Sequence, residues 1–276
     1  MPGAGVDNAP TIRLNGGMMR FAAALAVALA LALASPSPAA AMVGGAPPAE
    51  PQIARHVVLI IGSRGTSCTG VAVARDLVLT AAHCVLPGAD YKLVEFDAAR
   101  QPSFKDVAGV ARHPQFDLNT LLGHRATADV ALLKIAQPLA GTFVPAALLG
   151  PRKPVTAGDD FVVAGYGVTV RGDGKTGGTI RTARLVATGQ PGTLQIRLVD
   201  AATRNEGAGL GACTGDSGAP VFDMADARPA VIGVVSWSTG PGNSAGCGGL
   251  TGVTPLARYR DWIVQQAARM GSALAP

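Results

Sequence analysis

The stretch from residue 209 to residue 220, which reads GLGACTGDSGAP, constrains this chain more than any other segment. Glycines surround the serine at position 217, and because Gly and Asp are frequent turn formers, we expect a sharp turn here. So small a backbone can present the Ser217 hydroxyl to a substrate while neighbouring N–H groups point at the same place. By itself the pattern is also typical of an ordinary turn, so other parts of the chain must decide whether Ser217 is a nucleophile.

Two further patches each attach a polar residue to an apolar, strand-like run. Residues 80–84 read TAAHC and place His83 directly after one such run, while residues 129–134 read DVALLK and place Asp129 at the head of another. A purely structural interpretation gives no reason for a His, an Asp and a Ser to lie at the ends of apolar strands. The combination therefore favours nucleophilic catalysis by serine.

In these three patches the chain resembles the chymotrypsin/trypsin-like serine peptidases. That family carries T-A-A-H-C, D-I-A-L-L and G-D-S-G-G-P signatures in the chain order His, Asp, Ser. The resemblance extends from Met42 to the C-terminus. It implies an all-β fold of two packed six-stranded antiparallel Greek-key barrels with a short C-terminal helix. One departure is Ala219, where the family has glycine, which adds a methyl group beside the site.

Composition agrees with an all-β chain. The sequence holds 36 Gly and 20 Pro, which favours short strands joined by turns over long helices. Its net charge is +5, but the arginines are spread thinly with no basic cluster. We therefore expect no nucleic-acid partner.

The first 41 residues are typical of a secretory signal. Met18-Met19-Arg20 is followed by an apolar run over 21–34 and an A-x-A site that ends at residue 41. The apolar run is 14 residues long, too short to span a bilayer comfortably. We expect translation to begin at residue 18 or 19 and the signal to be removed, with a retained anchor as the alternative.

The remaining residues, 42–276, are expected to form one peptidase domain. The first barrel is assigned to about 42–145 and the second to about 146–255, with a Pro- and Gly-bounded crossover over 145–154 between them. Apolar residues at helical spacing predict a terminal amphipathic helix over about 256–270.

The resemblance assigns a role to each residue of the site. His83 would take the Ser217 proton, and Asp129 would fix the tautomer of the imidazole. The backbone N–H groups of Gly215 and Ser217 would form the oxyanion hole. The amino group freed at Met42 would fold inward and pair with Asp216, because a buried carboxylate without a partner is costly.

The resemblance also places the primary substrate pocket. Gly211, six residues before the nucleophile, would lie at its base, where an acidic residue would select Arg or Lys. Its walls would come from Ser236, Trp237, Ser238 and Gly252. With no acid at the base, we expect an open pocket for uncharged side chains, and Ser238, which replaces the family's glycine, could narrow the entrance.

The four cysteines form no C-x-x-C pair, so a metal site is not favoured. Cys68 and Cys84 flank the strand that leads to His83, and Cys213 and Cys247 flank the Ser217 segment. Pairing 68 with 84 and 213 with 247 also matches the family's positions. Each bridge would contribute about 3–4 kcal/mol on a loop-entropy estimate.

Together these observations predict a secreted or periplasmic serine endopeptidase that cleaves after uncharged residues. No cofactor, no metal and no membrane contact are expected for the mature form, which would be a monomer acting on proteins or peptides. A catalytically silent, peptidase-like binding protein is the alternative. An α/β-hydrolase is excluded, because position 219 is Ala rather than Gly and the chain order is His, Asp, Ser. His56, His113 and His124 have no motif around them and are expected to be structural or exposed.

Overall fold

A computed structural model describes residue 3 and residues 42–123, 125–148, 154–188, 194–226 and 228–274. The signal segment expected over residues 1–41 lies outside this part of the chain, residue 3 apart, as do His124 and half of the crossover expected over 145–154. Residues 39–276 form one compact unit. In the described part of the chain, no helix combines the length and hydropathy needed to cross a membrane.

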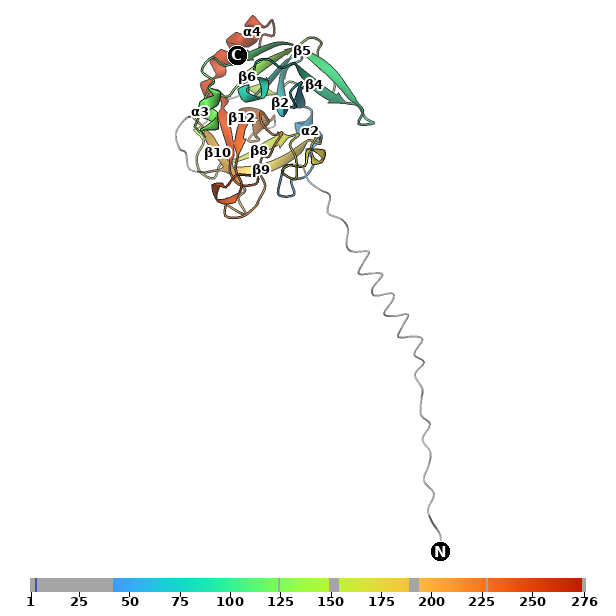
Figure 1. Ribbon diagram of the computed structural model, residues 1–276, viewed down its shortest axis with the longest axis vertical. Coiled ribbons are helices and arrows are strands. Elements are labelled where there is room, and N and C mark those ends of the chain that lie inside the picture. The colour runs from blue at the N-terminus through green and yellow to red at the C-terminus, as the bar shows by residue number, and fades with distance from the viewer. Residues whose placement is uncertain are drawn as a thin grey trace. The chain divides into compact units, whose positions relative to one another are not determined.

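The first half of this unit is a closed antiparallel barrel, as the resemblance implied (Figure 1). Its strands are β1 (Val57–Gly62), β2 (Ser67–Ala74), β3 (Leu77–Thr80), β4 (Tyr91–Phe96), β5 (Pro102–Arg112) and β6 (Ala131–Ile135), in the barrel order β1-β2-β3-β6-β5-β4. The apolar, strand-like run that precedes His83 forms two strands, because Arg75 and Asp76 form the turn between β2 and β3.

The second half is also a closed barrel. Its strands are β8 (Asp160–Gly165), β9 (Arg181–Ala187), β10 (Ile196–Val199), β11 (Pro220–Asp223), β12 (Ala230–Ser238) and β13 (Thr251–Pro255). The sheet order is β11-β8-β9-β10-β13-β12, and pairing of β11 with β12 closes the ring. A short strand, β7 (Ala147–Leu148), adds to β12 in parallel.

The buried apolar side chains form three clusters, and strands that contribute to two of them have no polar face. One cluster fills each barrel, and the third lies between the barrels and includes Leu79 of the first and Phe222 of the second. In β1 the side chains of Val58 and Ile60 face the barrel interior, while Val57 and Leu59 join the cluster between the barrels. Burial on both faces makes the strand continuously apolar rather than alternating.

Helices are short and peripheral. They are α2 (Pro51–Ala54), α3 (Leu118–Leu122), α4 (Arg260–Arg269) and the 3-10 turns η1 (Ala82–Val85), η2 (Gly174–Thr176), η3 (Pro241–Asn243) and η4 (Leu256–Arg258). The helix expected over 256–270 is therefore split, with Tyr259 between η4 and α4. Figure 1 shows α4 lying across the first barrel near β6.

The two described histidines without a motif are buried. His56 lies close to the Val144 carbonyl, with 2.6 Å between Nδ1 and the oxygen. His113 packs edge-on against Tyr259 and Trp262, each at 4.9 Å between ring centroids, and so fixes the C-terminal helix to the first barrel. Burial lowers the pKa of both imidazoles below the ordinary value.

Candidate active site

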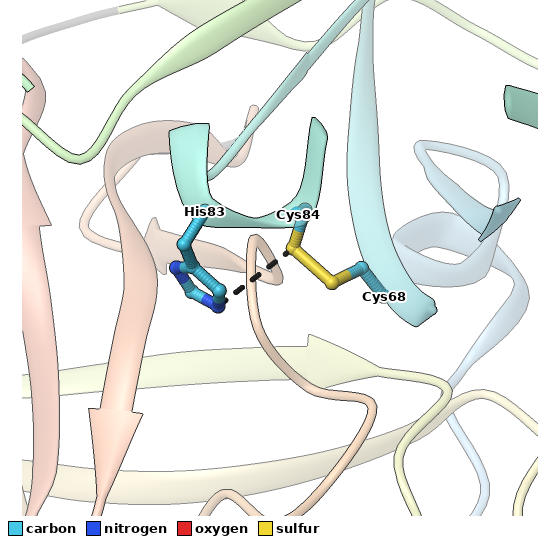
Figure 2. Close-up of side chains that lie close together, drawn as sticks. All are labelled: Cys68, His83 and Cys84. Atoms are coloured by element: carbon cyan, nitrogen blue, oxygen red, sulfur yellow. Dashed lines mark hydrogen bonds between the residues drawn. A yellow bond between two sulfur atoms is a disulfide. The ribbon is translucent and has the colours of Figure 1, made fainter. Parts of the chain in front are cut away.

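His83 lies on η1, directly after β3, beside a disulfide between Cys68 and Cys84 (Figure 2). The His83 and Cys side chains bring three possible metal-ligand atoms within 4.8 Å of one another. Both sulfurs are consumed in the disulfide, so neither is available as a thiolate ligand. The bridge instead fixes η1 to β2, and with it the position of His83.

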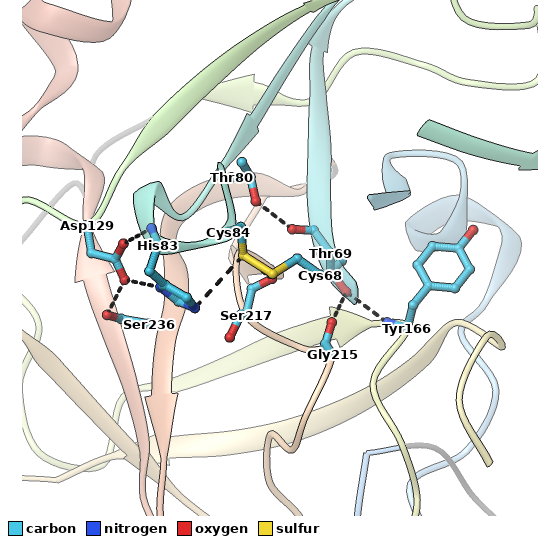
Figure 3. Close-up of a disulfide and its surroundings, with 10 residues drawn as sticks. All are labelled: Cys68, Thr69, Thr80, His83, Cys84, Asp129, Tyr166, Gly215, Ser217 and Ser236. Atoms are coloured by element: carbon cyan, nitrogen blue, oxygen red, sulfur yellow. Dashed lines mark hydrogen bonds and ion pairs between the residues drawn. A yellow bond between two sulfur atoms is a disulfide. The ribbon is translucent and has the colours of Figure 1, made fainter. Parts of the chain in front are cut away.

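Asp129, just before β6, holds His83 by two hydrogen bonds (Figure 3). Its Oδ1 accepts from the His83 backbone N–H at 2.9 Å, and its Oδ2 lies 2.8 Å from Nδ1 of the ring. Asp129 is fully buried, whereas the His83 side chain is 20% exposed. A carboxylate at Nδ1 keeps the proton on that nitrogen, so Nε2 is left to accept one.

Ser236, on β12 of the second barrel, supplies a third donor to Asp129. Its Oγ donates to Asp129 Oδ2 at 2.6 Å. These three hydrogen bonds satisfy the buried Asp129 carboxylate within the described part of the chain. The sequence placed Ser236 in the pocket wall, but its side chain faces Asp129, which leaves only its backbone for that wall. Nothing in the local sequence indicated this bond, because its two residues lie 107 positions apart.

Ser217 lies in the loop before β11, between Asp216 and a glycine with φ of 79°. Cys84 Sγ is 3.6 Å from the Ser217 carbonyl oxygen and 3.9 Å from His83 Nε2. Ser217 and the His83 imidazole therefore both contact this sulfur and lie near each other. The structure records no hydrogen bond between Ser217 and His83. Such bonds are often long without substrate and tighten in the reacting complex.

Two backbone N–H groups in this loop are left without an acceptor. Within the described residues, neither the N–H of Gly215 nor that of Ser217 donates a hydrogen bond, whereas those of Asp216, Gly218 and Ala219 all do. Gly215 has φ of 96°, a conformation that a side chain would disfavour. Free N–H groups on alternate residues can converge on one oxyanion.

The carbonyl groups of the same peptides are anchored. The Thr214 carbonyl accepts from Val168 N at 2.8 Å, and the Asp216 carbonyl accepts from Ala219 N at 2.9 Å. These carbonyls belong to the peptide groups that carry the N–H groups of Gly215 and Ser217. A peptide group is planar, so fixing its carbonyl also fixes the direction of its N–H.

Thr69 of β2 ties this loop to the first barrel (Figure 3). Its backbone N–H donates to the Ser217 carbonyl at 2.8 Å, and its Oγ1 donates to the Gly215 carbonyl at 2.8 Å. The same hydroxyl accepts from Tyr166 N at 3.0 Å, so both its donor and its acceptor capacity are used. Sequence reasoning missed Thr69, which looked like any β-branched strand residue.

Asp216 is the second fully buried carboxylate of the site. Its oxygens accept from Gly167 N and Cys213 N, each at 2.9 Å, and the described residues supply no cationic partner. Burial raises the pKa of Asp216 to about 7, although these two hydrogen bonds oppose the shift. Gly165 and Gly167 pack directly against the carboxylate and leave no room for a side chain.

The family described as Trypsin matches residues 42–263. The chain belongs to the trypsin family.

Similar proteins carry related names. The chain is 32% identical over 254 residues to serine protease 56 of Homo sapiens, an alignment that covers 84% of this chain and 39% of that protein. It is 30% identical over 241 residues to vitamin K-dependent protein C of Oryctolagus cuniculus, an alignment that covers 75% of this chain and 48% of that protein. This trypsin-family chain thus spans less than half the length of these two relatives.

A solved structure supports the fold. Human heparin binding protein superposes with a TM-score of 0.61 at 23% identity, over 80% of this chain and 95% of that one. A likeness at that identity shows that the two trypsin-like folds agree and nothing further. The two closed barrels and short C-terminal helix predicted from the sequence are confirmed.

Met42 begins the region matched by the trypsin family. Its side chain is fully buried in the apolar cluster of the second barrel, and the next residue, Val43, forms a bridge with Gly211. Met42 has φ of 49°, a left-handed conformation that costs an ordinary side chain about 1–2 kcal/mol. Cleavage before Met42 would remove that torsion altogether.

The residues expected to form the primary pocket are only partly brought together. Gly211 packs against Gly248, and the indole of Trp237 lies directly on Gly252, where any side chain would collide with the ring. Ser238 donates from Oγ to the Gly246 carbonyl at 3.5 Å. The indole therefore occupies the space beside Gly252.

The second disulfide, Cys213–Cys247, ties the Ser217 loop to the segment before β13. Both disulfides thus join the pairs that the resemblance implied. Each of them fixes a segment that carries one candidate catalytic residue.

Proposed function

We propose that this chain is a serine endopeptidase in which Ser217 attacks the scissile carbonyl and forms an acyl-enzyme. The observation that carries the proposal is the hydrogen bonding of Asp129, which orients His83 so that Nε2 is free to act as a base. The serine proteases among the relatives support the same reaction class.

In the proposed reaction His83 Nε2 removes the proton of Ser217 Oγ as that oxygen bonds to the carbonyl carbon. The imidazolium then gives the proton to the leaving amine as the peptide bond breaks. A water molecule, deprotonated by the same nitrogen, then attacks the ester carbonyl, and the imidazolium returns that proton to Ser217 Oγ as the bond between Oγ and the acyl carbon breaks. Asp129 stays ionised and stabilises the imidazolium throughout.

The free N–H groups of Gly215 and Ser217 would stabilise the oxyanion that forms on the carbonyl oxygen. Their directions are fixed in advance by the anchored carbonyls, so little reorganisation is needed during the reaction. A single donor of this kind is worth about 3–4 kcal/mol in the transition state.

Cleavage before Met42 would complete the site. The new ammonium group would supply the cation that the buried Asp216 carboxylate lacks, and pairing would hold the Ser217 loop in its active form. Because an A-x-A site ends at residue 41, signal peptidase itself would generate the active N-terminus. N-terminal sequencing of the active secreted protein should find Met42, and an active species that starts upstream would overturn this route.

The substrates would be proteins or peptides, cut after uncharged residues, because no acid lies at Gly211. Two disulfides and the signal pattern support action outside the cytoplasm, in a periplasm or the medium.

The test is covalent labelling of the secreted protein by a fluorophosphonate probe, with Ser217→Ala as the control. Stoichiometric labelling that the variant loses would identify Ser217 as an activated nucleophile. Absence of labelling in a folded protein that starts at Met42 would overturn the proposal and favour a catalytically silent binding protein.

A further inference from the structure

A cavity of about 370 Å³ lies beside β12, on the side of Trp237 away from the barrel interior. Arg197 of β10, Trp237, Ser238 and Leu250 line it, together with the loop that carries Asn243 and Ala245. Sequence reasoning assigned Trp237 and Ser238 to the primary pocket and gave Arg197 no role.

Arg197 is a half-buried cation without a partner in the described part of the chain. Its Nε is shielded from solvent and makes no hydrogen bond. The residues left undescribed near it in sequence, 189–193, read GQPGT and contain no acid. Arg184, one strand away on β9, is by contrast paired with Asp160. Buried donors are nearly always satisfied, so the Arg197 guanidinium has hydrogen-bonding capacity to offer an incoming acceptor.

Strand register places Arg197 and Trp237 on one face of the sheet. Arg197 is opposite Gly252 of β13, and Gly252 is in turn opposite Trp237 of β12. Residues directly opposite on neighbouring strands project to the same side. Trp237 Nε1 is also buried without an acceptor, so the cavity holds two unsatisfied donors and one flat apolar ring.

The local charge is positive. Arg171 reaches the same loop and donates from Nη1 to the Ala245 carbonyl at 3.2 Å. Asp200, the acid nearest to Arg197 in sequence, accepts from Ala202 N and Leu210 N with its two oxygens. An acceptor for Arg197 must therefore come from outside the described residues.

The cavity adjoins the reacting groups. Ser236, whose hydroxyl binds Asp129, immediately precedes Trp237 on β12. Strand β11 pairs with β12 only as far as Val234, so the edge from Ser236 to Ser238 carries no strand of the described chain. A peptide that adds to this edge would direct its alternate side chains toward the cavity.

We propose that this cavity takes an acidic side chain of the substrate, whose carboxylate accepts hydrogen bonds from Arg197 and from Trp237 Nε1. The inference rests on the proposed endopeptidase function and adds a specificity determinant to it. The cavity shares Trp237 and Ser238 with the residues expected to form the primary pocket, but its lining does not include Gly211, the expected base of that pocket. A planar guanidinium can bind a carboxylate by two parallel hydrogen bonds, which a neutral amide of the same shape cannot reproduce.

The test uses the secreted protein and peptide substrates that differ only by Glu or Gln at each position on the acyl side of the cut. At one position kcat/KM should favour Glu by about tenfold, the effect of one partly solvated charge-assisted hydrogen bond. Arg197→Gln should reduce that Glu/Gln ratio to about one, and Arg197→Lys should keep part of it. Arg184→Gln removes the same charge from the neighbouring strand and should leave the ratio intact.

A second measurement separates this inference from the proposed function. Ser217→Ala protein should bind the acidic peptide about tenfold more tightly than the amide peptide by calorimetry, and Arg197→Gln in that background should abolish the difference. Labelling of Ser217 by the fluorophosphonate with no Glu preference at any position would overturn the inference while the peptidase function stands. A preference that survives Arg197→Gln, or a preference for aromatic residues instead, would overturn it as well.

Discussion

Two fully buried aspartates serve the site in opposite ways. Asp129 receives three hydrogen bonds, two of them from His83 and one from Ser236. Asp216 receives only two backbone hydrogen bonds, and burial raises its pKa to about 7. The first carboxylate is satisfied within the chain, whereas the described residues give the second no cation. On the proposed activation route, one half of the site is preformed and the other half depends on a new N-terminus.

The largest effect should follow from Asp129→Asn in protein that starts at Met42. An amide NH₂ facing Nδ1 would move the imidazole proton to Nε2, which could then no longer accept the Ser217 proton. We expect kcat to fall about 10⁴-fold, or ~5.5 kcal/mol, with KM little changed. Steady-state kinetics checks this. Asp76→Asn is the control, because Asp76 is paired with Lys134 far from His83, and it should cost less than twofold.

The next effect concerns the stability of the uncut chain. The folded-state pKa of Asp216, about 7, lies above the ordinary 3.8, so the folded chain binds this proton more tightly than the unfolded chain. Tighter binding of this proton stabilises the folded chain fully below about pH 4. That part of the free energy of unfolding, roughly 4 kcal/mol at most, is lost as the pH rises through 7. Chemical denaturation of protein with residues retained before Met42 should show this decline.

Asp216→Asn in the uncut chain isolates the part of the pH dependence that comes from Asp216, because the variant keeps every other titrating group of the parent. The variant should lose the decline between pH 4 and pH 7 relative to the parent. If both proteins follow the same pH dependence, Asp216 already has a cationic partner before cleavage.

The same substitution should act differently in the mature protein. Once Met42 carries a free ammonium, Asp216→Asn leaves that charge buried and unpaired, and the Ser217 loop loses its anchor. We expect kcat/KM to fall about 10²-fold, or ~2.7 kcal/mol, the cost of a disordered oxyanion hole. The uncut chain should meanwhile be unaffected or stabilised. Equal damage to both forms, measured by kinetics and denaturation, would contradict the difference between the two aspartates.

The sequence predicted the residues of the three motifs better than the residues that hold them in place. His83, Asp129 and Ser217 stand out because each is a polar residue attached to an apolar strand or a glycine turn. Ser236 and Thr69 do not stand out, because a hydroxyl on a strand has the same local pattern whether or not it has a distant partner. Thr69 and Gly215 are 146 positions apart, and only the packing of the two barrels brings them together.

The local sequence also predicted only part of the fold. The Gly and Pro content and the strand-like runs indicated short strands, and the resemblance supplied the two barrels. The break at Tyr259 was missed because η4 and α4 share one continuous helical spacing of apolar residues. The position of the Trp237 indole against Gly252 was missed because the orientation of a side chain leaves no trace in sequence.

The smallest expected effect concerns the Thr69 hydroxyl, which connects the preformed half of the site to the half that depends on cleavage. Thr69→Val keeps the shape of the side chain but leaves the Gly215 carbonyl and the Tyr166 N–H without their partner. The peptide between Gly215 and Asp216, which lies between the two peptides that carry the oxyanion donors, would lose one of its anchors, and kcat should fall about tenfold, or ~1.4 kcal/mol, with KM nearly unchanged. Thr69→Ser should restore most of the rate, because it returns the hydroxyl.

Thr80→Val is the matched control. Thr80 is equally buried, and its hydroxyl donates to the Thr69 carbonyl at 2.8 Å, so that bond stays within the first barrel. Both variants remove one buried hydroxyl and should lower the free energy of unfolding by similar amounts, about 1–3 kcal/mol. Only Thr69→Val should lower kcat, because the Thr80 hydroxyl lies beside Gly218 without a hydrogen bond to the loop, whereas the Thr69 hydroxyl donates one to Gly215. Equal losses of kcat in the two variants would mean that Thr69 acts through general stability, and that the orientation of Gly215 is set within the second barrel alone.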